Sequence, residues 1–165
     1  MPVYSETISD ERILRILGNK YRRVLLVGCG ACMNESLAYK NDLPIYKGSP
    51  DFPYATAAEV SRIEKLLKTN GYEVEKKTYD DIDGFYCMTD ISSAKYPVDW
   101  TITPDIILIL SCGAGLLAIR DKLPEMQVMK IAKQRGYLSY GFNDTNDQRT
   151  ISKSDSAVIP FTTGG

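Results

Sequence analysis

Cysteines are the residues of this chain best suited to chemistry, because the sequence contains no histidine. The four cysteines are Cys29, Cys32, Cys87 and Cys112. The lack of histidine excludes a Ser–His or Cys–His nucleophile pair and every metal site with an imidazole ligand. Any bound metal must therefore be held by thiolate, carboxylate or carbonyl groups. Four thiolates are the ligand set of a structural zinc ion or of an iron–sulfur cluster.

Two of the cysteines follow apolar runs with similar endings. VLLVG and DIILIL are both typical of buried parallel strands, and each leads within a residue or two into Cys-Gly-Ala and a predicted helix. The carboxyl ends of parallel strands meet at one edge of a sheet, where ligands bind. We therefore expect Cys29 and Cys112 to lie at the same edge, each at the N-terminus of a helix.

The other two cysteines complete a possible ligand set. Cys32 forms a Cys-x-x-Cys pair with Cys29, a spacing at which both can bind one metal or cluster. Cys87 lies in the polar loop GFYCMTD and can swing over as the fourth ligand. The sequence therefore predicts one metal centre held by all four cysteines, with a [4Fe–4S] cluster favoured and zinc as the alternative. Unliganded buried cysteines are a third possibility.

Small residues surround the predicted centre. Helix N-termini expose backbone N–H groups and a partial positive charge, which favour thiolates and an anionic cluster. Small side chains let those N–H groups approach the sulfur atoms, whereas a zinc ion gains less from such a cradle. The predicted cofactor-binding residues are Gly28, Gly30, Ala31, Gly113, Ala114 and Gly115.

A nucleotide-binding turn is the main alternative interpretation of the first motif. GCGACM begins like the G-x-G-x-x-G fingerprint, but Met33 stands where the fingerprint has Gly or Ala. No acidic residue ends a second strand about 20 residues later, as the fingerprint requires. This alternative would make the protein a Rossmann-like enzyme with Cys29 or Cys112 as the nucleophile.

Strand and helix patterns alternate along the chain. SDERILRILGN (9–19) predicts a helix that Ser9 or Asp10 caps and Gly18 ends. Residues 56–71 predict a longer helix that begins with a Thr56–Glu59 capping box. The alternation predicts a three-layer, Rossmann- or flavodoxin-like α/β fold with a mainly parallel sheet. Residues 1–165 would form one domain, with irregular loops at 39–55 and 80–104.

Composition excludes some kinds of partner. A formal net charge of −1 argues against a nucleic-acid surface. The longest apolar runs are far shorter than the roughly 18 residues of a membrane span. The N-terminal residues lack the basic start and apolar stretch of a signal peptide, so we expect a cytoplasmic protein.

The chain resembles the methylenetetrahydrofolate reductase C-terminal domain family, which includes the small V-type subunit of acetogen reductases. The resemblance covers roughly residues 9–142 and is most specific at GCGAC and at SCGAG after the second buried strand. It implies an iron–sulfur or zinc module of one-carbon metabolism, with the four cysteines as ligands and no catalytic residues of its own. The implied partner is a larger catalytic subunit, such as a flavin-containing TIM-barrel reductase or a corrinoid methyl-transfer protein.

The sequence also departs from this family. Relatives commonly carry a third cysteine in the first motif, where this chain has Ser36, and they tend to continue into a cysteine-rich C-terminal segment. A second metal site is therefore not expected. Three functions follow from the sequence: an iron–sulfur accessory subunit for electron transfer or assembly, a zinc-stabilised interaction module, and the nucleotide-binding enzyme.

Overall fold

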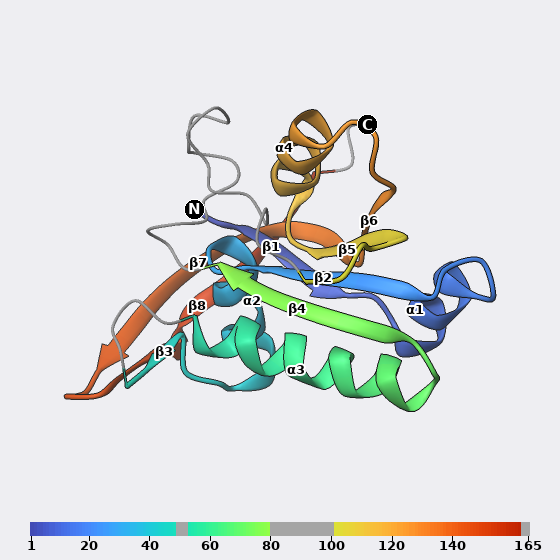
Figure 1. Cartoon of the computed structure of the whole chain (residues 1–165). Coiled ribbons are helices and arrows are strands. Elements are labelled where there is room, and N and C mark those ends of the chain that lie inside the picture. The colour runs from blue at the N-terminus through green and yellow to red at the C-terminus, as the bar shows by residue number, and fades with distance from the viewer. Residues whose placement is uncertain (49–52, 80–100, 163–165) are drawn as a thin grey trace.

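A computed structural model of the chain describes residues 1–48, 53–79 and 101–162. Within these residues the strands form two four-stranded sheets (Figure 1). The parallel sheet has the order β4 (Glu73–Tyr79), β2 (Arg23–Cys29), β5 (Ile106–Leu110) and β6 (Val128–Lys130). The antiparallel sheet has the order β1 (Val3–Thr7), β7 (Ala132–Asp144), β8 (Gln148–Pro160) and β3 (Tyr46–Lys47).

The parallel sheet forms the centre of the core. All five residues of β5 are buried, as are residues 24–29 of β2, because helices cover both faces of these strands. Helix α3 (Tyr54–Thr69) lies along one face and α4 (Gly113–Lys122) on the other (Figure 1). The two apolar runs therefore form adjacent buried parallel strands, as their sequences predicted.

The predicted Rossmann- or flavodoxin-like fold with a mainly parallel sheet is wrong, because half of the described strands belong to the antiparallel sheet. Most of that sheet is the long hairpin of β7 and β8. Buried and exposed residues alternate along much of β7, so its sequence lacks the continuous apolar run of a buried parallel strand. The apolar runs QVMKIA (127–132) and SAVIPF (156–161) predict strands and overlap β6 and β8, but no pattern predicts a strand at residues 3–7 or 133–144.

Ile131 connects the two sheets without a loop. It follows β6 of the parallel sheet and directly precedes β7 of the antiparallel sheet. Its N–H donates to Ile109 O of β5, and its carbonyl accepts from the N–H of Ile8, the residue after β1. The residue is fully buried. The antiparallel hairpin therefore begins beside the parallel core, close to the strand ends that carry the cysteines.

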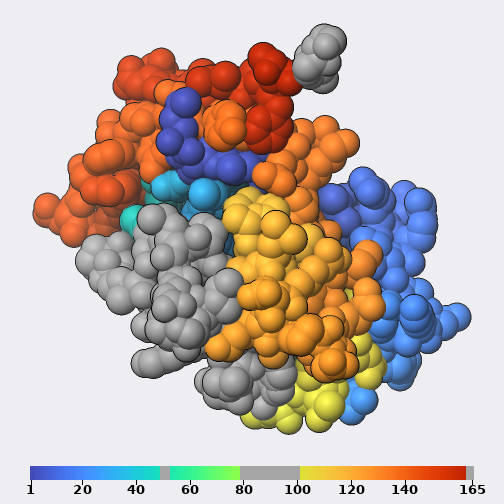
Figure 2. All heavy atoms as spheres, turned by 90° about the horizontal axis from the view of Figure 1, so that it is seen from above, coloured from blue at the N-terminus to red at the C-terminus, as the bar shows by residue number. Residues whose placement is uncertain are grey.

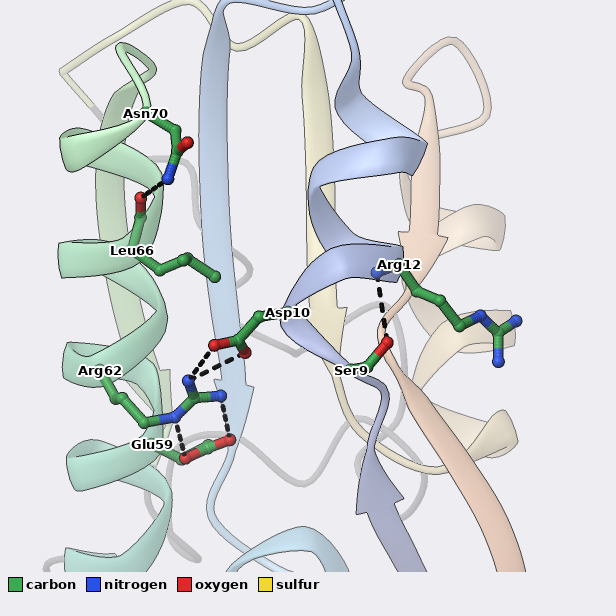
Figure 3. A network of polar contacts seen from close by, with 7 residues as sticks. All are labelled: Ser9, Asp10, Arg12, Glu59, Arg62, Leu66 and Asn70. Atoms are coloured by element: carbon green, nitrogen blue, oxygen red, sulfur yellow. Dashed lines mark hydrogen bonds and ion pairs between the residues drawn. The ribbon is translucent and has the colours of Figure 1, made fainter.

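Helix α1 (Asp10–Leu17) begins and ends as its sequence predicted. Ser9 is the N-cap, and its side chain accepts a hydrogen bond from the Arg12 N–H. Gly18 ends the helix with a positive φ of 48°, a conformation that glycine adopts easily. Figure 3 shows the Ser9–Arg12 contact.

An ion-pair network joins α1 to α3. The Arg62 guanidinium donates to both oxygens of Asp10 and to both oxygens of Glu59, at 2.9–3.0 Å (Figure 3). Glu59 is buried, and the Arg62 side chain is about half exposed. The network therefore fixes α1 against α3, although its exposed part adds little stability.

Helix α3 does not begin with the predicted capping box. The helix starts at Tyr54, which places Thr56 inside the first turn. The Thr56 N–H donates instead to the Asn34 side chain, and the Thr56 hydroxyl donates to the Cys29 carbonyl. Glu59 pairs with Arg62 rather than with the helix start. A side chain of a neighbouring helix has replaced the local cap.

The two predicted irregular stretches fall partly outside the described residues. In 39–55, helix α2 (Cys32–Asn41) continues to residue 41, β3 occupies 46 and 47, and α3 begins at 54. Residues 49–52 lie outside the described part, as do 80–100 of the second stretch. Helix α2 packs against β1 and β8 of the antiparallel sheet and against α3.

Candidate thiol site

The two cysteine motifs lie next to each other at the carboxyl ends of β2 and β5. These strands are parallel neighbours, with Gly28 opposite Leu110. Helix α2 begins at Cys32 directly after β2, and α4 begins at Gly113 with Cys112 as its N-cap. We call this place, where two strand ends meet two helix N-termini, the thiol edge. The prediction that the motifs share one edge of a parallel sheet is confirmed.

Cys32 and Cys112 interact with each other at the thiol edge. The contact between their side chains is the largest influence on the pKa of each. It lowers the pKa of Cys112 and raises that of Cys32, so a Cys32 S–H group faces a Cys112 thiolate. Burial also raises the pKa of Cys32. Cys112 is buried and Cys32 is partly exposed.

Further contacts stabilise the negative charge on Cys112. After the contact with Cys32, the backbone N–H groups of Gly115 and Ala114 and the charge of Lys130 lower its pKa, against the opposing effect of burial. The result is a pKa of about 5, well below the ordinary value of a thiol. This is the effect expected for a thiol at a helix N-terminus.

Cys29 occupies a different environment. It is the last residue of β2, is 5% exposed and belongs to the hydrophobic core cluster. Its carbonyl accepts the Thr56 hydroxyl at 2.9 Å. Cys87, the fourth predicted ligand, lies outside the described residues. In the described part of the chain, no three Cys, Asp or Glu side chains are grouped as a metal site.

The small residues around the thiols have separate roles. A Cβ on Gly28 would lie 2.6 Å from methyl groups of both Thr56 and Val60, so glycine lets α3 pack closely on β2. A Cβ on Gly113 would meet only the end of the Gln134 side chain, at 2.9 Å. Gly28 is therefore needed for the packing of α3 on β2, independently of any role in binding a ligand.

The other predicted cradle residues lie in the two turns. Gly30 and Ala31 are buried in the turn before α2, where Ala31 is the N-cap. Ala114 and Gly115 are in the first turn of α4, and their N–H groups face the Cys112 sulfur. The N–H donors at the Cys112 sulfur thus belong to the second motif, whereas the Cys32 sulfur accepts the backbone N–H of Val3 on β1.

Ser36 holds the start of α2 against the antiparallel sheet. Its hydroxyl accepts the Ser5 N–H at 3.0 Å and lies 2.7 Å from Cys32 O and 3.2 Å from Val3 O. The side chain is fully buried. These backbone contacts account for Ser36 without a ligand role.

Sequence reasoning missed several polar residues beside the thiol pair. Lys130 ends β6 and donates to the Gln134 side chain on β7, at 3.2 Å. The Tyr140 hydroxyl on β7 donates to Glu35 on α2 at 2.6 Å, and Glu35 is one influence that raises the pKa of Cys32. No local spacing could have indicated these residues, because β7 reaches the thiol edge only through the unpredicted antiparallel sheet.

Comparisons with protein-family models, with curated proteins and with solved structures each give no match. The resemblance to the methylenetetrahydrofolate reductase C-terminal domain family therefore stays a prediction. None of the helices in the described ranges is both long and apolar enough to span a membrane.

Proposed function

We propose that this chain is a non-catalytic accessory subunit that carries a cysteine-ligated metal centre, a [4Fe–4S] cluster, at the thiol edge. The observation that supports this function best is the contact between Cys32 and Cys112. These residues come from different helices and meet at the carboxyl edge of a parallel sheet, where ligands of α/β proteins bind.

The chemistry of the pair fits a thiophilic metal. Metals bind thiolates rather than thiols, and Cys112 has a pKa of about 5. The N–H groups of Ala114 and Gly115 are the kind of donors that stabilise cluster sulfur atoms and tune their potential. Cys32 and Cys112 would supply two ligands, and Cys29 and Cys87 are proposed to complete the set of four. When bound, such a centre supplies one-electron transfer or holds the fold.

The proposed role is electron transfer within a larger oxidoreductase, or assembly of that enzyme. The resemblance stated above suggests a methylenetetrahydrofolate reductase-like complex of one-carbon metabolism in the cytoplasm. The partner would be a larger catalytic subunit, such as a flavin-containing TIM-barrel reductase or a corrinoid methyl-transfer protein. This chain would position the centre and exclude water from it.

The test is the iron, sulfide and zinc content of protein purified without oxygen, together with its visible spectrum. About four irons per chain, with a broad absorption that bleaches on reduction, would support the cluster. A single zinc without colour would replace it by a structural zinc centre, whose removal should unfold the protein. Protein without either metal would overturn the proposal.

Single Cys→Ser variants test the ligand set. Cys32→Ser and Cys112→Ser should each lose most of the metal, and Cys29→Ser and Cys87→Ser should do the same if all four are ligands. Ser36→Ala is the matched control next to Cys32, and it should keep the wild-type metal content. Full metal content in both Cys32→Ser and Cys112→Ser would contradict the site.

A further inference from the structure

We propose that Cys32 and Cys112 form a reversible intramolecular disulfide by exchange with a low-molecular-weight disulfide, and that this oxidised form cannot accept the metal. The disulfide itself depends only on the thiol pair. Its effect on metal uptake rests on the function proposed above. The thiol edge would thus be a redox-modification site as well as a ligand site.

The geometry that supports the disulfide is the direct contact of two thiols on different elements. Cys112 is fixed as the N-cap of α4, and Cys32 is fixed at the first residue of α2. The side chains of the two cysteines interact with each other. Neither is in a disulfide in the described structure. Two thiols whose side chains interact in this way are suitably placed for an intramolecular exchange.

The two cysteines also differ in a way that suits sequential exchange. Cys32 is partly exposed, so an external disulfide can reach its sulfur. Cys112 is only 6% exposed, so an external disulfide has little access to its sulfur. The first bond should therefore form on Cys32, and Cys112 should resolve it from inside.

Cys29 is the natural comparison within the same motif. It is as buried as Cys112, but it packs in the hydrophobic core cluster. The contact that dominates the Cys112 thiol comes from Cys32. A Cys-x-x-Cys motif would ordinarily suggest a disulfide between its own two cysteines. The structure favours the pair that crosses from α2 to α4.

The disulfide forms in two successive thiol–disulfide displacement steps. The Cys32 thiol passes its proton to the Cys112 thiolate and attacks one sulfur of the external disulfide. This breaks that S–S bond, forms a mixed disulfide on Cys32 and releases one thiolate, which takes the proton back from Cys112. Cys112 sulfur then attacks Cys32 sulfur, which forms the Cys32–Cys112 bond and releases the second thiolate. The two cysteines lose two electrons and the single proton of Cys32, the external disulfide gains them, and the last thiolate released takes its proton from the solvent.

The consequence for the metal follows from ligand chemistry. A metal or cluster needs thiolate ligands, and a disulfide offers none. Oxidation of the pair would remove two of the four proposed ligands together, while the fold around them stays intact. Reduction would restore them.

The first experiment uses the full chain, stripped of metal and reduced, and oxidised glutathione as the probe. After incubation, the remaining thiols are alkylated in denaturant, and the mass and the peptide map are measured. We expect two of the four thiols to be lost, with a peptide that links Cys32 to Cys112. Four remaining thiols, or a bond between any other two cysteines, would overturn the inference.

Three variants make the result specific. Cys29→Ala should still form the disulfide, because Cys29 is not a member of the pair. Cys112→Ser should stop at the mixed disulfide on Cys32. In Cys32→Ser, we expect neither a mixed disulfide nor an intramolecular disulfide at Cys112. A mixed disulfide on Cys112 in the Cys32→Ser protein would contradict the proposed order. Circular dichroism of each variant shows whether it is folded.

The second experiment separates this inference from the proposed function. Oxidised and reduced proteins are incubated with iron and sulfide, and the bound iron is measured. We expect the oxidised form to bind roughly ten-fold less iron, with recovery after reduction by dithiothreitol. Equal binding by both forms would overturn the effect on metal uptake. No iron in the reduced protein would overturn the proposed function, whereas the disulfide mapping would still stand.

Discussion

The turns after β2 and β5 have nearly the same sequence but different structures. In the first, Cys29 still belongs to the strand and packs in the core, and α2 begins three residues later at Cys32. In the second, α4 begins immediately, with Cys112 as its N-cap. The partner of Cys112 is therefore Cys32 rather than Cys29, the residue that matches it in the motif.

The surroundings of the two turns differ in the same way. The first turn is enclosed, with α3 packed on Gly28 and with buried hydroxyl groups on the carbonyls of Cys29 and Cys32. The second turn leads to a helix with an exposed outer side, where Leu117 is 66% exposed, and α4 lies on the surface in Figure 2. Substitutions in the enclosed first turn should therefore lower the unfolding free energy more than matched substitutions in the second turn.

The largest difference should appear between Gly28→Ala and Gly113→Ala. The new Cβ at position 28 would press on methyl groups of two β-branched residues in α3, and we expect a loss of about 1–3 kcal/mol in unfolding free energy. At position 113 the flexible Gln134 side chain can move, and alanine favours a helix, so the change should be close to zero. Urea unfolding of both variants measures this, and equal losses would mean that the turns are equally enclosed.

Ser36→Ala and Ser111→Ala compare the hydroxyl groups that contact the carbonyls of Cys32 and Cys112. Loss of the Ser36 hydroxyl leaves the buried Ser5 N–H without its acceptor, at a cost of about 1–3 kcal/mol. The Ser111 hydroxyl donates to Cys112 O, which also accepts the Leu116 N–H, so its loss should cost about 1 kcal/mol or less. Thermal and urea unfolding should give this order. The reverse order would show that the second turn depends more on its hydroxyl.

Thr56→Val tests the hydrogen bond from α3 to Cys29 without changing the side-chain shape much. The Cys29 carbonyl loses the hydroxyl donor at 2.9 Å, and we expect a loss of about 1 kcal/mol. Metal content should remain that of the wild type, because the thiols do not move. A large loss of metal together with unchanged stability would mean that Thr56 positions the Cys29 sulfur for binding.

Asp105 lies just before β5, at the end of the parallel strands opposite the thiol edge, and its ionisation should make the stability of that end depend on pH. Its carboxylate accepts the N–H groups of Arg23 and Arg22 and pairs with the Arg23 guanidinium, which lowers its pKa from 3.8 to about 2. A lowered pKa in the folded state stabilises the protein above about pH 4, and this stabilisation is lost as the pH falls toward 2. Asp105→Asn should therefore lose stability at pH 6 and depend less on pH between 6 and 3 in urea unfolding. An unchanged pH dependence would contradict this role.

The sequence predicted the parts of the fold whose signals are local. The apolar runs of β2 and β5 and the helix ends at Ser9 and Gly18 follow from patterns within a few residues. The start of α3 could not be predicted, because its N-terminal N–H group is satisfied by Asn34 on a different helix. Strand β7 was missed since its sequence has no continuous apolar run and its pairing with β1 joins distant parts of the chain.

The sequence by itself determined that any metal must be held without histidine, and that cysteines would meet where two parallel strands end. Only the tertiary structure decided which of them interact. The strands lie in register with Gly28 opposite Leu110, but their helices begin at different distances from the strand ends. That offset depends on how α2, α3 and the antiparallel sheet pack together, and these contacts are long-range. It places Cys32 beside Cys112 and leaves Cys29 in the core.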